Sequence, residues 1–233
     1  MSGEYLFEVP AVPAVPVEGE TGKYPVTRIF CVGRNYAAHV AEMGFEVDRE
    51  APFYFTKPAS AITPSGSTIP YPPGTENCHH EMELVLAMGK PVFKASTEGA
   101  AGAVYGYAAG IDLTRRDLQI ASREKGRPWD FGKAFENSAI ISSITPATVF
   151  GEVGPQRIMM TLNGEVKQDA RLSDMIWKVP EIISHLSGYY HLQPGDLIYT
   201  GTPAGVGPVT PGDVMLGEID GCAPLSLTIG PAE

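Results

Sequence analysis

The pattern of apolar and polar positions along this chain predicts many short strands and few helices. Residues 28–32 are a run of β-forming residues, and residues 36–43 have the spacing of a short helix that ends at Gly44. Residues 45–78 are dense in Pro, Ser, Thr and Gly around the apolar stretch PFYF. We therefore expect most of that segment to be loop.

The middle of the chain predicts two strands and two helices. Residues 81–88 (EMELVLAM) and 105–114 are predicted as strands, with a helix at 97–104 between them. Thr114 is a typical N-cap residue, and an aspartate three residues later completes the pattern of a capping box. A second helix is therefore expected over about 115–125.

The C-terminal part carries clear turn signals. Asn163-Gly164 between two strand-like runs predicts a β-hairpin, and Pro180 at a first-turn position predicts a helix. Pro-Gly-Asp turns at 194–196 and 211–213 each precede a predicted strand. These features favour a strand-dominated α+β fold.

Composition agrees with that fold class. The 233 residues include 26 Gly and 21 Pro, which favours turns and short strands over a helical bundle. Residues 28–233 are expected to form a single domain. Residues 1–27 are a Pro-rich lead-in whose segment 9–17 (VPAVPAVPV) favours an extended conformation, packed against the body or a partner subunit, or else disordered.

Charge and cysteine content narrow the possible environment. The formal net charge is −10 without a basic cluster, which argues against nucleic acid or an anionic membrane as a partner. The 3 cysteines are far apart and form no Cys-x-x-Cys pair, which favours a reducing compartment. With no signal-peptide pattern and no long apolar run, a cytoplasmic protein is expected.

Two glutamates in the segment HHEMELVLAM are the strongest candidate for chemistry. In a strand, Glu81 and Glu83 share one face, with Met82 and Leu84 on the other. Two carboxylates about 4 Å apart in a partly dry site repel each other by roughly 4 kcal/mol at an effective dielectric constant of about 20. A proton or a hard divalent cation such as Mg²⁺ or Mn²⁺ would relieve that repulsion. An exposed sheet face with two solvated glutamates is the alternative.

Further candidates follow two predicted strands. Asp112 ends the second buried strand and is either a third metal ligand or a helix cap. Arg116, Gln119 and Arg123 then share one helix face, which suits either an anion-binding site or a solvated surface.

A histidine and a glutamate are spaced for acid–base chemistry on the first helix. His39 and Glu42 lie three residues apart, so a carboxylate can orient the imidazole as a general base, although any such pair has the same spacing. Lys57 and Lys133 have apolar neighbours, which is unusual for lysine unless the side chain reaches solvent. The glycine-rich turn at 201–207 lacks the spacing of a phosphate-binding loop.

Together these segments resemble the fumarylacetoacetate hydrolase family, in its short single-domain acylpyruvate and fumarylpyruvate hydrolase type. The resemblance covers nearly all of residues 28–219 in the order of the family. It rests on CVGRNYAAHVAEMG, FTKPASA, HHEMELVLAMGK, GYAAGIDLTRRDLQ, GRPWDFGKAFENSAI, MIWKVPEIISHLS and GDLIYTGTPAGVGPV. The resemblance implies a mixed β-sandwich roll around a metal site, in homodimers.

The resemblance also implies roles for individual residues. The Mg²⁺ or Mn²⁺ ligands would be Glu81, Glu83 and Asp112, and the catalytic residues would be His39, Glu42 and Lys133. The substrate contacts would be Arg34, Lys57, Arg116, Gln119 and Thr202.

The implied reaction is hydrolysis of the C3–C4 bond of an acylpyruvate in aromatic-compound catabolism, with fumarylpyruvate favoured. The metal would bind the 1-carboxylate and 2-oxo group, His39 would activate water for attack on C4, and Lys133 would stabilise the departing enolate of pyruvate. Oxaloacetate decarboxylation, or a hydroxymuconate-type isomerisation or decarboxylation, is the alternative, because each passes through an enolate. A non-catalytic metal-binding protein is disfavoured, since every expected catalytic residue type is present.

Overall fold

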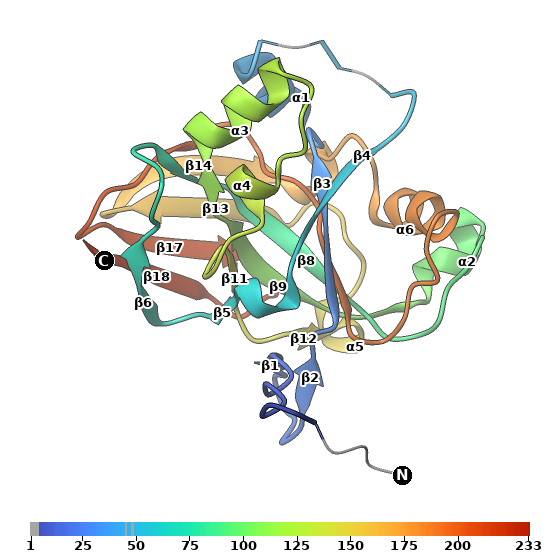
Figure 1. The fold of residues 1–233 in the computed structure, drawn as a ribbon. Coiled ribbons are helices and arrows are strands. Elements are labelled where there is room, and N and C mark those ends of the chain that lie inside the picture. Colours follow the sequence, from blue (N-terminus) through green and yellow to red (C-terminus); the bar gives the residue numbers. More distant parts are fainter. Residues whose placement is uncertain (1–4, 45, 48) are drawn as a thin grey trace.

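Two curved β-sheets form the body of the protein, and the computed structural model describes residues 5–44, 46–47 and 49–233 (Figure 1). In spatial order the larger sheet contains β4 (Phe53–Lys57), β3 (Arg28–Gly33), β15 (Asp196–Tyr199), β8 (Met82–Met88), β9 (Val104–Asp112), β11 (Ala139–Ile141) and β5 (Ile62–Pro64), with β12 (Thr145–Pro146) also paired to β9. The second sheet contains β14 (Glu165–Arg171), β13 (Arg157–Leu162), β17 (Val214–Ile219), β18 (Leu225–Ala232) and β6 (Ser67–Tyr71). A small third sheet contains β10 (Thr114–Arg115), β7 (Cys78–His80) and β16 (Gly207–Pro208).

The two large sheets pack face to face through the side chains of β8. Met82 and Leu84 belong to the same buried cluster as Met215 and Leu227 of the second sheet. Both large sheets are mixed, because β3–β15, β5–β11 and β6–β18 are parallel pairs among antiparallel ones. The expected strand-dominated α+β fold, a mixed β-sandwich roll, is confirmed.

Short helices cover the ends of the sheets. They are α1 (Ala37–Glu42), α2 (Thr97–Ala101), α3 (Arg116–Glu124), α4 (Asp130–Lys133), α5 (Ala147–Phe150) and α6 (Val179–Ser187), with 3-10 turns η1 (Ala59–Ala61) and η2 (Leu172–Asp174). In Figure 1, α1 and α3 lie at one end of the sheets, at the top of the view. No helix among the described residues is long and apolar enough to span a membrane.

Several local predictions are confirmed. Asn163 and Gly164 connect β13 and β14 with φ angles of 54° and 81°, as the tight hairpin turn requires. The helix at Pro180 is present, and the two Pro-Gly-Asp turns lead into β15 and β17.

Three local predictions are wrong. The segment 45–78, expected to be mostly loop, contains β4, β5, β6 and the first residue of β7, because these short strands pair with partners far away in the sequence. The helix expected over 97–104 ends at Ala101.

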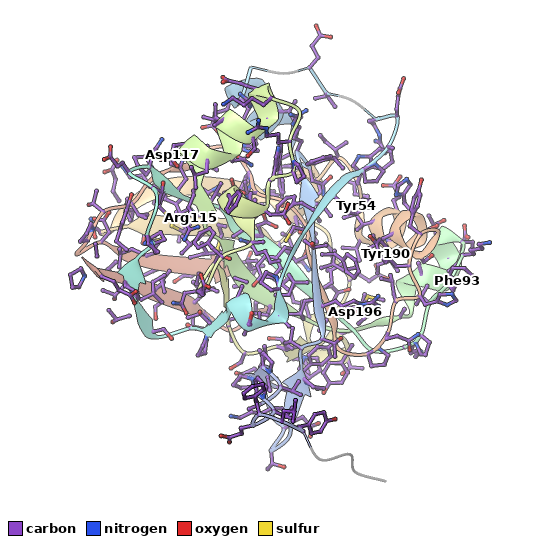
Figure 2. The ribbon with its side chains drawn as sticks, viewed as in Figure 1. Tyr54, Phe93, Arg115, Asp117, Tyr190 and Asp196 are labelled. Atoms are coloured by element: carbon purple, nitrogen blue, oxygen red, sulfur yellow. The ribbon has the colours of Figure 1, made fainter. Side chains whose placement is uncertain are left out.

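Thr114 does not cap α3, because it lies in β10 and its hydroxyl accepts a hydrogen bond from Lys133. Asp117 points instead toward the loop before β7, where it accepts hydrogen bonds from Thr75 and Glu76 (Figure 2).

The N-terminal segment forms a small hairpin of β1 (Ala14–Pro16) and β2 (Lys23–Pro25). Val15 and Tyr24 are buried against the larger sheet, and the Tyr24 hydroxyl donates to the carbonyl oxygen of Met88 at 2.8 Å. The start of β15 is held by a further contact, since Arg28 forms an ion pair of 2.6 Å with Asp196 (Figure 2).

Close packing at Gly110 generates a test of this arrangement. A Cβ at Gly110 would lie 2.5 Å from Cγ2 of Val85 and 2.8 Å from Cε1 of Tyr199. Gly110→Ala should therefore lower the free energy of unfolding by about 1–3 kcal/mol in urea denaturation. Gly102→Ala is the control, because a Cβ there meets nothing within 4 Å. Equal stability of the two variants would contradict the packing.

Candidate active site

Three carboxylates meet where β8 and β9 lie side by side. Glu83 pairs with Gly110 in the β8–β9 register, and the backbone N–H of Asp112 donates to the carbonyl oxygen of Glu81 at 2.9 Å. Glu81, Glu83 and Asp112 each offer an oxygen atom, and these atoms all lie within 4.8 Å of one another. The side chains are buried, with residue exposures of 5%, 1% and 0%. The alternative of solvated glutamates on an exposed face is therefore wrong.

Positively charged side chains surround the carboxylates. Lys133 Nζ lies 2.8 Å from Oε2 of Glu81 and 2.6 Å from Oδ2 of Asp112. Arg116 contacts Oε1 of Glu81 at 2.6 Å, and Lys57 Nζ lies 2.8 Å from Oδ1 of Asp112. The cluster is therefore a buried network of both charge signs rather than a group of isolated acids.

Nearby positive charges do not offset the burial of the three carboxylates equally. Burial raises the pKa of Glu83 well above its usual range, and the negative charges of Asp112 and Glu81 raise it further. Burial also opposes ionisation of Glu81, but Lys133 and Arg116 outweigh it and lower the pKa of Glu81. Glu83 receives a hydrogen bond of 2.7 Å from the backbone N–H of Gly201. A further positive charge beside Glu83 would therefore stabilise its ionised form.

This donor set fits a hard divalent cation. Mg²⁺ and Mn²⁺ prefer carboxylate oxygen ligands, and three such groups converge here. Burial lowers the pKa of Lys133, but Asp112 and Glu81 raise it by more, so the ammonium remains charged beside the cluster.

A cavity opens above the cluster, between α1 and α3. Eight of the predicted site residues line it, namely Arg34, His39, Glu81, Glu83, Arg116, Gln119, Lys133 and Thr202. The other three, Glu42, Lys57 and Asp112, are not among its lining residues. Further lining residues that no sequence pattern indicated are Val32, Gly33, Met43, Phe55 and Trp129. Arg123, expected on the same helix face as Arg116 and Gln119, lines the cavity with them.

Lys57, predicted as a substrate contact, does not line the cavity. Its ammonium is fully buried, and it donates to the backbone carbonyl oxygens of Leu113 and Lys133. Together with the contact to Asp112, this holds the segments after β9 and around α4 together.

The histidine and glutamate of α1 are brought together as predicted. His39 Nδ1 lies 3.0 Å from Oε2 of Glu42, and His39 is buried. The other carboxylate oxygen of Glu42 accepts a hydrogen bond of 3.0 Å from the backbone N–H of Gly205. Gly205 has a φ of +97°, and a Cβ there would collide with the carbonyl oxygen of Lys167. A glycine is therefore required at the residue that holds Glu42.

Gln168 is a further residue of the site that was not predicted from the sequence. This buried side chain of β14 accepts a hydrogen bond from the backbone N–H of Met82 at 2.9 Å. It donates to the hydroxyl of Thr202 at 2.8 Å and to the carbonyl oxygen of Pro203 at 2.9 Å. Gln168 therefore joins the strand of the glutamates to the glycine-rich turn. No local sequence signal indicates this, because its partners are far away in the chain.

Known proteins are similar to this chain over most of its length. The family model described as fumarylacetoacetate (FAA) hydrolase C-terminal matches residues 28–230. A fumarylpyruvate hydrolase from Ralstonia sp is 54% identical over 194 residues, which cover 82% of this chain and 100% of that protein. The oxaloacetate tautomerase YcgM from Escherichia coli is 38% identical over 205 residues, which cover 88% of this chain and 93% of that protein.

A solved structure is similar over nearly the whole chain. The crystal structure of fumarylpyruvate hydrolase from Pseudomonas aeruginosa in complex with Mn²⁺ and pyruvate matches with a TM-score of 0.94. The two chains are 46% identical, and the match covers 98% of this chain and 100% of that one.

The position of Gln168 generates a prediction about stability. Gln168→Ala leaves the buried N–H of Met82 and the hydroxyl of Thr202 without this partner. Because each unsatisfied buried group costs about 1–3 kcal/mol, the free energy of unfolding should fall by at least about 2 kcal/mol. Gln156→Ala is the matched control, since the side chain of Gln156 forms its hydrogen bonds within a surface turn, with Gly154 and Glu152. Equal urea midpoints for both variants would contradict this role.

Proposed function

Because this chain belongs to the fumarylacetoacetate hydrolase family, we propose that it is a metal-dependent hydrolase of acylpyruvates. Its substrate is fumarylpyruvate, which it cleaves between C3 and C4 to give fumarate and pyruvate. The observation that carries this proposal is the buried acidic cluster beneath a cavity that also holds an oriented histidine. The similarity to two fumarylpyruvate hydrolases supports the choice of substrate.

Glu81, Glu83 and Asp112 hold the metal ion, Mg²⁺ or Mn²⁺. When bound, the ion supplies Lewis-acid polarisation of the 2-oxo group and favours negative charge on its oxygen. Lys57 orients Asp112 from behind rather than contacting the substrate.

His39 and Glu42 activate the water. With Nδ1 held by Glu42, the Nε2 atom of His39 is the one that can accept a proton from water. The hydroxide attacks C4, and the C3–C4 bond breaks with its electron pair forming the enolate of pyruvate. The proton that His39 took from water then passes to C3 and completes pyruvate. Gly205 keeps Glu42 in place throughout.

Lys133 and the face of α3 act on the pyruvate half. The Lys133 ammonium is a fixed positive charge beside the cluster, where the enolate forms. Arg116 and Gln119 are hydrogen-bonded to each other and line the cavity. They bind the substrate head group together with Thr202, and Arg34 lies at the entrance.

Oxaloacetate tautomerisation is the second candidate, because oxaloacetate tautomerases are also among the relatives. It shares the enolate but consumes no water. A mass-balance assay with Mn²⁺ against fumarylpyruvate, acetylpyruvate and oxaloacetate separates the two. Equimolar fumarate and pyruvate from fumarylpyruvate support the proposal. Interconversion of oxaloacetate tautomers without any cleavage of the acylpyruvates would overturn it.

We also propose a cytoplasmic homodimer that acts in aromatic-compound catabolism. The cysteines are free, which supports a reducing compartment. The exposed side chains of Tyr5, Leu6 and Phe7 offer apolar surface for a second copy. Light scattering should give twice the chain mass, and a monomer at micromolar concentration would contradict the dimer.

Metal dependence gives the next prediction. Glu83→Gln removes a ligand, so Mn²⁺ affinity should fall by at least about 100-fold, beyond the cost of losing an outer-shell partner. Isothermal titration measures the affinity, and Glu98→Gln on exposed α2 is the control. Chelator-treated wild-type protein should be inactive and recover with Mn²⁺. Full activity after chelation would contradict the assignment.

The role of His39 gives a further prediction. His39→Ala should lower kcat for fumarylpyruvate by about 10²–10⁴-fold, the usual contribution of a general base. His191→Ala is the control, because His191 is exposed and stacks on Phe93. A His39→Ala enzyme with a wild-type kcat would mean that the base lies elsewhere.

A further inference from the structure

Four basic side chains line one cavity of this acidic protein. The chain carries a formal net charge of −10, and Arg34, Arg116, Arg123 and Lys133 line the cavity together with Glu81 and Glu83. Arg116 and Lys133 form ion pairs with Glu81. Arg34 lies in the turn after β3, and Arg123 lies in the last turn of α3.

The α3 helix sets the spacing between the two ends of the cavity. Arg116 and Arg123 are seven residues apart on one helix face, and both line the cavity. At about 1.5 Å per residue, their Cα atoms are separated by roughly 10 Å along the helix. A seven-carbon 2-oxo diacid with C–C bonds of about 1.5 Å spans roughly 7–8 Å between its carboxyl carbons. A diacid of this length that has its 2-oxo acid end at Arg116 places its other carboxylate near Arg123.

The backbone at Arg34 is held by the next residue in the chain. Arg34 has a φ of +58°, a conformation that costs a residue with a side chain about 1–2 kcal/mol. The buried Asn35 holds it there, because its side chain accepts from the N–H of Trp177 at 2.7 Å and donates to the carbonyl oxygen of Thr200 at 2.8 Å. Arg34 and Arg123 line the same cavity, and burial and then the positive charge of Arg123 lower the pKa of Arg34.

We propose that Arg34 and Arg123 form a subsite for the distal carboxylate of a long 2-oxo diacid. Arginine suits this task because its planar group forms paired hydrogen bonds with a carboxylate. The subsite selects seven-carbon diacids over acylpyruvates that end in a methyl group, and over four-carbon diacids that are too short to reach it. This inference rests on the proposed function, since it assigns the cavity to a 2-oxo acid.

Binding of two unreactive probes tests the subsite independently of hydrolysis. The probes are 2-oxoheptanedioate and 2-oxoheptanoate, which have the same length and differ only in the distal carboxylate. Isothermal titration with Mn²⁺-loaded protein should show tighter binding of the diacid by about 10–100-fold. Arg123→Gln and Arg34→Gln should each remove most of that preference and leave the binding of 2-oxoheptanoate within about threefold of wild type.

Arg127→Gln is the matched control. Arg127 lines an adjoining cavity with Tyr54 and Trp129, so its loss should leave the preference unchanged. The proposal is overturned if wild-type protein shows no preference, if the Arg34 and Arg123 variants weaken both probes equally, or if Arg127→Gln alone removes the preference. A preserved diacid preference in a protein that does not cleave fumarylpyruvate would overturn the proposed function and support the subsite.

Discussion

The burial of acidic and basic side chains in one network is the constraint on which the rest of this structure depends. Glu81, Glu83 and Asp112 are almost inaccessible to solvent, as are Lys57 and Lys133. Removing an ion from water costs several kcal/mol, so each of these groups needs partners at hydrogen-bonding distance. Lys133 provides them for two carboxylates at once. Glu83 remains the carboxyl with the least compensation, which is why a metal ion fits beside it.

The fold meets this constraint by bringing together elements that are distant in sequence. The register of β8 and β9 places the acids side by side, and α4 presents Lys133 to them. The α4 helix packs closely against α3, since a Cβ at Gly132 would lie 2.9 Å from the Cα atom of Gln119. Gln168 and Gly205 then connect the second sheet and the glycine-rich turn to the same centre. His39 is held by Glu42, and Glu42 is in turn held by the glycine-rich turn through Gly205.

The features that could be predicted from sequence are those with local causes. The Asn163-Gly164 turn and the alternation in β8 need only neighbouring residues, and both are present. The candidate ligands were found because carboxylates in a buried strand are chemically costly. The strands within residues 45–78 could not be predicted, since they depend on pairing with distant partners. Thr114 occurs in the sequence pattern of an N-cap, but its hydroxyl accepts a hydrogen bond from Lys133. No local sequence pattern indicates this contact.

The most direct test of this account is anomalous diffraction from crystals grown with Mn²⁺. We expect one strong anomalous peak among the carboxylates of Glu81, Glu83 and Asp112, with metal–oxygen distances of about 2.1–2.3 Å. The peak should disappear in crystals of the Glu83→Gln protein soaked at the same concentration. A peak at another position, or none at this cluster in well-ordered wild-type crystals, would contradict the central claim that this buried network is a metal site.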